Sequence, residues 1–224
     1  MRLCYRNRVE LDAVQIGAPE VAEATAAYRL LLAIEPTRFD GDVSRFQLAR
    51  GAVEIVPGQA GLQSIRFVGE PGGAWPDSFH GLRVLTSAAA PMAAAPDAGV
   101  ALDHVVVRTS DADRAIVLWR DRVGLRLALD RVFPERGMRL TFLRSAGITL
   151  ELATSEPPQE EQTEPDAFYG VSYRVSDLEQ RRARLLADGI DVSEVRRGMR
   201  PGTSVVSVRS GTGGVPTLLL QVNA

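Results

Sequence analysis

The sequence has little of what most often marks a function. It contains one cysteine, Cys4, which excludes an internal disulfide framework and fits a reducing compartment. It contains two histidines, and aromatic residues make up only 6%. From so few histidines, and with Cys4 in a terminal segment, no Ser-His-Asp or Cys-His catalytic arrangement can be argued.

Charge of one sign and long apolar runs are also missing. The formal net charge is -2, which gives no electrostatic reason to expect binding to nucleic acid or to an anionic membrane. No stretch approaches the roughly 20 apolar residues of a membrane span, and the N-terminus lacks the apolar run of a signal peptide. With 45% hydrophobic and 24% charged residues, the composition is that of a globular protein that we expect in the cytoplasm.

The sequence does contain an internal repeat. LDAVQIG at 11–17 and LDHVVVR at 102–108 are each followed by a segment with apolar residues at helical spacing. Leu11 matches Leu102, and Tyr28 matches Trp119, at one constant offset. This constancy across a strand and a helix predicts two copies of one βαβββ unit, with Tyr28 and Trp119 packed against a sheet.

A third copy begins near residue 168, and an abridged fourth copy lies between 61 and 87, where two strands are expected without a helix between them. Ser110 with Asp113, and Ser176 with Glu179, resemble capping boxes that would begin the second and third helices.

Two proline-punctuated linkers divide the chain. AAAPMAAAPDAG at 88–99 separates two halves, and the acidic EPPQEEQTEPD at 156–166 separates the second and third copies. We therefore expect an N-terminal half over 1–90, with one full and one degenerate unit, and a C-terminal domain over 100–224 with two units.

A repeated βαβββ unit that begins with LDHVVV and ends with ITLEL resembles the vicinal oxygen chelate superfamily, which includes glyoxalase I, extradiol dioxygenases and bleomycin resistance proteins. The resemblance is strongest over 101–153 and implies an α+β fold, with repeated βαβββ units forming paired, cupped, mixed sheets. It also implies a ligand cavity in the C-terminal pair.

The resemblance further implies metal ligands on the first and last strands of paired units. The unit at 101–153 supplies His104 and Glu151, the usual pair of the family. The partner unit has Gly170 and Leu218 at the matching positions, and neither can bind a metal.

The N-terminal unit offers Ala13 and Glu54, again an incomplete pair. For Glu54 alone, an exposed carboxylate at a strand edge is the simpler interpretation.

Coordination chemistry leaves two interpretations open. Catalytic zinc normally takes three protein ligands, and harder ions take about six donors, so His104 and Glu151 fall short unless His80, Glu54 or a loop residue joins them. A divalent ion (Zn, Ni, Mn or Fe) at an incomplete site is one interpretation. A His–Glu pair that lines a cavity without metal is the other.

Two classes of function follow. The first is a glyoxalase- or dioxygenase-like enzyme, a lyase, isomerase or dioxygenase, in which Glu151 doubles as the proton-transferring catalytic base. The second is a metal-free protein that binds or sequesters a small organic molecule, as in bleomycin resistance. A homodimer is compatible with both. The arginines of EVRRGMRPG at 194–202 fit either an anionic substrate or a solvated hairpin.

Overall fold

The computed structural model describes residues 9–38, 42–71, 74–88, 93–95, 98–157 and 164–223; Cys4 lies outside them. The strands form two sheets that contain both parallel and antiparallel pairs, so the expected α+β class with mixed sheets is confirmed. The first sheet contains β1 (Val9–Ala18), β2 (Thr37–Arg38), β3 (Ser44–Gln47), β4 (Ala52–Pro57), β5 (Gly61–Gly69) and β6 (Val84–Ser87). The second contains β7 (Val100–Arg108), β8 (Arg126–Phe133), β9 (Met138–Ser145), β10 (Ile148–Ser155), β11 (Ala167–Val175), β12 (Arg196–Arg197), β13 (Thr203–Val208) and β14 (Thr217–Val222).

The strand order confirms the repeat. Within each of the three full copies, the first strand lies beside the last, followed by the third and then the second: β1-β4-β3-β2, β7-β10-β9-β8 and β11-β14-β13-β12. The first and last strands run parallel in the first and third copies, which requires the crossover that the helix provides. The abridged copy contributes β5 and β6.

Helices occur where the apolar spacing predicts them. They are α1 (Val21–Leu32), α2 (Ala112–Ile116) and α3 (Leu178–Ala187). The second helix departs from the prediction, because Val117–Arg122 continues it as a π-helix in which Val123 N donates to Leu118 O at 3.0 Å. In this region Trp119 is nevertheless fully buried, as its spacing predicts.

The helix starts differ from the predicted capping boxes by one residue. Asp111 and Asp177, rather than Ser110 and Ser176, are the last extended residues before α2 and α3. Each aspartate side chain accepts a hydrogen bond at 2.9 Å from the backbone N–H three residues ahead. An ionised carboxylate at this position also interacts favourably with the positive end of the helix dipole, which a hydroxyl cannot match.

The chain forms two compact units, each composed of three segments. Unit 1 contains Met1–Asp12, Ser64–Met92 and Val105–Phe168, and unit 2 contains Ala13–Gln63, Ala93–His104 and Tyr169–Ala224. All strands of the first sheet come from 9–87 and all strands of the second from 100–222, whereas each compact unit combines segments of both halves. The division into 1–90 and 100–224 therefore stays a prediction.

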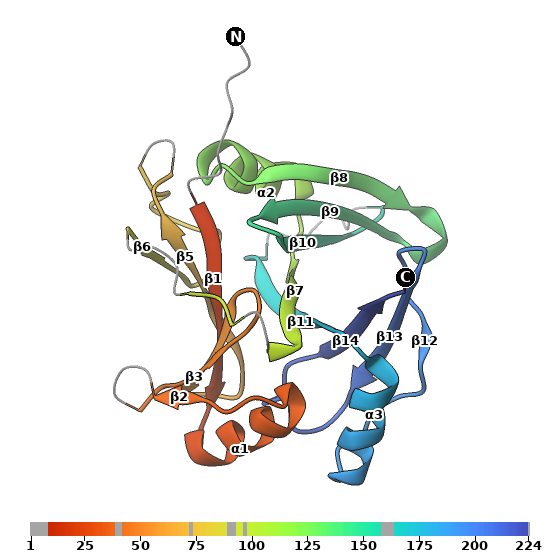
Figure 1. The fold of residues 1–224 in the computed structure, drawn as a ribbon. Helices are drawn as coiled ribbons and strands as arrows, with labels where there is room; N and C mark the ends of the chain where they lie inside the picture. The colour runs from red at the N-terminus through yellow and green to blue at the C-terminus, as the bar shows by residue number, and fades with distance from the viewer. Residues whose placement is uncertain are drawn as a thin grey trace. The chain divides into compact units, whose positions relative to one another are not determined.

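Each unit has an aromatic core. In unit 1 the ring of Trp119 lies 5.8 Å from that of Phe67 and 5.5 Å from that of Phe79, measured between centroids. In unit 2 the fully buried Tyr28 donates to the Thr212 carbonyl at 2.9 Å. Also in unit 2, α1 contacts β4, and α3 lies against β13 and β14 (Figure 1). Within the described residues, no helix has the length and apolarity needed to cross a membrane.

The interpretation of Glu54 as an exposed strand-edge carboxylate is wrong. Strand β4 lies between β3 and β1, so Glu54 has a neighbouring strand on each side and is fully buried. Its Oε1 accepts from Arg45, which is equally buried, and its Oε2 accepts from Gln15 Nε2 at 2.8 Å. Glu54 therefore belongs to an internal ion pair, as buried charges generally do.

Candidate functional site

His104 lies at the centre of a polar cluster in unit 2. Its Nδ1 lies 3.0 Å from Asp103 Oδ2, and its Nε2 lies 2.8 Å from Ser172 Oγ on β11. The His104 side chain is 18% exposed and that of Asp103 14%, whereas Ser172 is buried. The structure thus brings together a carboxylate, an imidazole and a hydroxyl, an arrangement for which the sequence alone gave no argument.

Arg174 completes this cluster from β11. Its Nε donates to Asp103 Oδ1 at 3.0 Å, and a second guanidinium nitrogen donates to the same oxygen. Burial alone would raise the pKa of Asp103, but the hydrogen bonds and charges of His104 and Arg174 outweigh it and lower the pKa to about 2. Asp103 is therefore ionised at neutral pH.

The ionised carboxylate determines which nitrogen of His104 carries the proton. A carboxylate can only accept, so Nδ1 is the donor to Asp103. In the neutral ring Nε2 is then an acceptor, and the Ser172 hydroxyl donates to it. The unprotonated Nε2 is thus the basic atom of the cluster, and a positive charge formed on the ring would lie beside the Asp103 carboxylate.

The strand register shows which side chains share the face of Ser172. Ser172 pairs with Leu218 on β14, which pairs with Ser207 on β13, and directly opposed residues point to the same face. Leu218 and Ser207 are only partly buried, whereas Tyr173 and Leu219, on the opposite face, are fully buried. The side chain of Tyr173 therefore belongs to the core, and the face of Ser172 is the more open and polar one.

The structure explains why residue 170 is a glycine, which the sequence alone does not reveal. A Cβ added at this position would lie 2.6 Å from the backbone carbonyl oxygen of Pro216, closer than real Cβ contacts come. Val171 N donates to this same oxygen at 3.0 Å, which holds the two segments together. A histidine at 170 would therefore disturb β11 before it could bind a metal, so Gly170→His cannot serve as a test for the missing ligand.

Two of the other predicted ligands, Glu151 and His80, lie in unit 1. Glu151 is partly buried on β10, opposite Phe142 of β9. His80 has a left-handed backbone (φ 55°), and its Nδ1 lies 3.5 Å from Oδ2 of the fully buried Asp166, which also accepts from Arg114 at 2.6 Å. His80 thus has a local carboxylate partner. The roles of His104 and Glu151 as metal ligands, and of Glu151 as catalytic base, stay predictions.

The donors described here do not fit a catalytic metal. Both ring nitrogens of His104 are engaged by Asp103 and Ser172, and the matching positions of the third copy are occupied by Gly170 and Leu218. Within the described ranges, no group of three or more His, Cys, Asp or Glu side chains could hold a metal ion. Catalytic zinc normally needs three protein ligands, and this cluster does not supply them.

Sequence reasoning missed Asp103, Ser172 and Arg174. One signal was available: Gly170, Ser172 and Arg174 alternate along an otherwise apolar strand, which places a hydroxyl and a guanidinium on one face. The partnership with His104 depends on which first strands lie side by side, and a single sequence does not determine this.

The ionisation of Asp103 makes the stability of the protein depend on pH. The pKa of Asp103 is about 2 when folded and 3.8 in the reference state, so its ionic contacts contribute about 2 kcal/mol above pH 4 and lose this as the pH falls towards 2. We expect Asp103→Asn to lower the unfolding free energy by about 2 kcal/mol at neutral pH and to remove the part of the loss below pH 4 that comes from Asp103. Urea unfolding across this range measures both effects.

Asp121→Asn is the control, because Asp121 is exposed and its replacement should change stability little. A variant as stable as the wild type at neutral pH would contradict the prediction.

Comparison with known proteins gives the following matches. The family described as the Glyoxalase/Bleomycin resistance protein/Dioxygenase superfamily matches residues 103–206. A methylmalonyl-CoA epimerase from Mycobacterium tuberculosis is 24% identical, with a TM-score of 0.45 over 55% of this chain and 87% of the other. A hypothetical protein from Bacillus halodurans is 18% identical, with a TM-score of 0.47 over 56% of this chain and 96% of the other. A Streptomyces coelicolor methylmalonyl-CoA epimerase in complex with 2-nitronate-propionyl-CoA is 23% identical, with a TM-score of 0.42 over 55% and 97%.

No protein with a curated description matches the chain. The family match covers His104, Ser172 and Arg174, together with the β7–β10 copy and most of the third copy. The strand order of these copies and the sequence match agree, and residues 103–206 belong to the vicinal oxygen chelate superfamily of glyoxalases, bleomycin resistance proteins and dioxygenases.

Proposed function

We propose that the domain containing residues 103–206 binds a small organic molecule at the face of Ser172 and moves a proton to and from it, with His104 as the general acid and base. One observation carries this proposal: the imidazole is held between the ionised Asp103 and the Ser172 hydroxyl, and part of the ring stays exposed. Imidazole is the side chain best suited to proton transfer near neutral pH.

The contacts give each residue a role in this chemistry. Asp103 holds the proton on Nδ1 and stabilises the imidazolium that forms when Nε2 takes a proton from the ligand. Arg174 keeps Asp103 ionised and in place. In the free protein the Ser172 hydroxyl is hydrogen-bonded to Nε2 of His104. Rotation about the χ1 angle of Ser172 would break this bond and make Nε2 available to a ligand. The proton then returns from Nε2 to the ligand. The protein therefore ends in its starting protonation state, and the reaction needs no co-reactant.

The activity can be tested on simple carbon acids. Pyruvate, 2-oxobutyrate and acetoacetate each carry C–H bonds next to a carbonyl group, and exchange of these protons for deuterium in D2O is followed by NMR. We expect the wild-type protein to accelerate exchange of at least one probe, and His104→Gln to reduce the acceleration about a hundredfold. His80→Gln, which changes the other histidine, should leave it unchanged.

Treatment with EDTA tests the metal at the same time. Exchange that persists in EDTA agrees with proton transfer by His104 alone. Exchange that is lost in EDTA and restored by zinc, nickel, manganese or iron would contradict metal-free proton transfer by His104. It would support the prediction that His104 and Glu151 bind a metal. Saturable ligand binding without exchange of any probe would instead favour a binding protein.

A homodimer and a cytoplasmic location stay predictions. Light scattering tests whether the protein is a dimer.

A further inference from the structure

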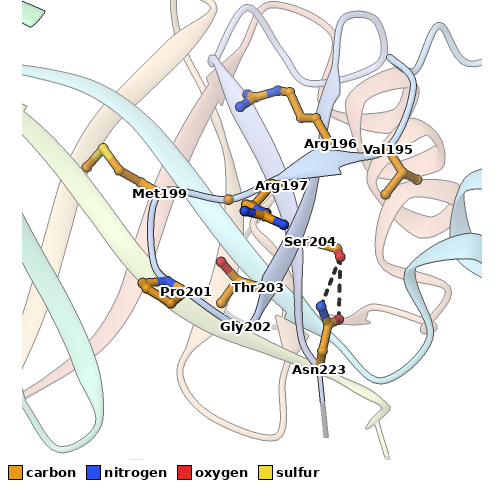
Figure 2. Close-up of a pocket in the computed structure, with 10 residues that line it drawn as sticks. Val195, Arg196, Arg197, Met199, Pro201, Gly202, Thr203, Ser204 and Asn223 are labelled. Atoms are coloured by element: carbon orange, nitrogen blue, oxygen red, sulfur yellow. Dashed lines mark hydrogen bonds between the residues drawn. The ribbon is translucent and has the colours of Figure 1, made fainter. Parts of the chain in front are cut away.

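A second candidate site lies in unit 2, at the turn between β12 and β13. It is a cavity of about 520 Å³, which is within the range of pockets that hold small organic ligands. Figure 2 shows the residues that line it, most of them from one hairpin. They are Val195, Arg196, Arg197, Gly198, Met199, Pro201, Gly202, Thr203, Ser204 and Asn223.

The lining of this cavity is positively charged. It includes Arg196 and Arg197 and no aspartate or glutamate. Among the described residues, the Arg197 side chain has no hydrogen bond or ion pair, and Arg196 reaches Ser207 Oγ only at the long distance of 3.5 Å. Since the whole chain carries a net charge of -2, this is a local concentration of positive charge.

The two arginines differ in position. Arg197 pairs with Ser204 and so shares its face, where Ser204 and Asn223 hydrogen-bond each other (Figure 2). Arg196 pairs with Val205 and points to the other face. Arg197 is therefore the principal cation on the side of the Ser204–Asn223 pair.

The turn that carries these arginines is closely built. Gly198 N donates to Thr203 O at 2.9 Å, Thr203 Oγ1 donates to Arg200 O at 2.5 Å, and Asn223 N donates to Gly202 O at 2.8 Å. A Cβ on Gly198 would collide with Oγ1 of Thr203, so the residue at 198 must lack a side chain.

The two arginines have an alternative role. Arginines can protect an edge strand from pairing with another strand, and β12 is an edge strand. Edge protection, however, requires neither a cavity nor a closely bonded turn.

We propose that this cavity binds the carboxylate or phosphate group of a small organic anion, with Arg197 as the main contact and Arg196 as a weaker one. The planar guanidinium matches both anions through charge-assisted hydrogen bonds. Ser204 and Asn223 add polar contacts beside Arg197, and Val195 and Pro201 offer apolar surface to the body of the ligand. The lining contains neither His104 nor Ser172, so this proposal does not depend on the proposed function.

Phenyl phosphate and benzoate are suitable probes, with benzyl alcohol as the neutral control. We expect saturable shifts of the backbone amide signals of Gly198, Gly202, Ser204 and Asn223 in NMR titrations of the full chain, with a Kd of about 1 mM or below. Arg197→Gln should weaken binding about tenfold, and Arg196→Gln less. Arg209→Gln, which removes an exposed arginine outside the lining, should change it less than about twofold. His104→Gln should bind as the wild type does, which separates this site from the proposed function.

The two anions distinguish the ligand chemistry. Tighter binding of phenyl phosphate assigns the site to organic phosphates, and tighter binding of benzoate assigns it to carboxylates. Three outcomes would overturn the proposal: no saturable binding of either anion, equal weakening by Arg197→Gln and Arg209→Gln, or amide shifts confined to other parts of the chain. Each of these would leave the arginines as protection of the β12 edge.

Discussion

Replacing Glu54 with alanine is expected to lower the free energy of unfolding by about 3–5 kcal/mol, because it leaves the guanidinium of Arg45 buried without its carboxylate. Both side chains are essentially inaccessible to solvent. Glu54 also accepts from Gln15 Nε2, so the substitution removes acceptors from two buried donors. Gln47 Oε1, which accepts from Arg45 Nε at 3.1 Å, cannot replace a negative charge. Urea unfolding followed by circular dichroism measures the loss.

The double variant Arg45→Met, Glu54→Leu is the matched control. It removes both charges and keeps apolar volume, so it should be less destabilised than Glu54→Ala. Some loss should remain, because Gln15 and Gln47 still lose their hydrogen bonds to the pair. If the single and the double variants are equally destabilised, the unpaired charge of Arg45 is not what destabilises Glu54→Ala. A single variant within about 1 kcal/mol of the wild type would contradict the internal ion pair.

Replacing Trp119 with alanine should lower the free energy of unfolding by about 3–5 kcal/mol, through loss of apolar burial and creation of a cavity in unit 1. The indole is fully buried and packs against Phe67 and Phe79. Thermal unfolding and urea titration both report this change. A loss below about 1 kcal/mol would show that the cluster is not an essential part of the core.

Trp119→Phe provides the control for this substitution. The indole Nε1 is buried and has no hydrogen-bond partner within the described residues, so phenylalanine removes an unsatisfied donor while keeping most of the apolar contact. We therefore expect a loss clearly smaller than that of Trp119→Ala. Equal losses would mean that the shape of the indole, and not its buried area, stabilises this region.

The fold was predictable because the repeat constrains strands and helices together. The constant offset between Leu11 and Leu102, and between Tyr28 and Trp119, predicted a common unit, and the shared strand order of the three copies confirms it. The helix starts were misplaced by one residue, because a serine followed by an aspartate offers two candidate caps and the backbone geometry selects the second.

The sequence singled out only one residue of the candidate site. The resemblance pointed to His104, but the ring's partners come from the neighbouring residue Asp103 and from Ser172 on another copy. A sequence pattern shows which residues share a face of one strand, and it does not show which strands lie side by side. For the same reason Glu54 was misinterpreted: whether β4 is an edge or an internal strand depends on pairing that its own residues do not encode.

The close approach of Gly170 to the Pro216 carbonyl limits how this domain can change. A single nucleotide change can alter a side chain, but at residue 170 any side chain meets backbone rather than open space. A metal-binding side chain at this position would require the segment around Pro216 to move, which needs at least one further change. A single substitution at residue 170 is therefore not expected to give the third copy a counterpart of His104. Substitutions around the existing Asp103–His104–Ser172 cluster do not meet this obstacle.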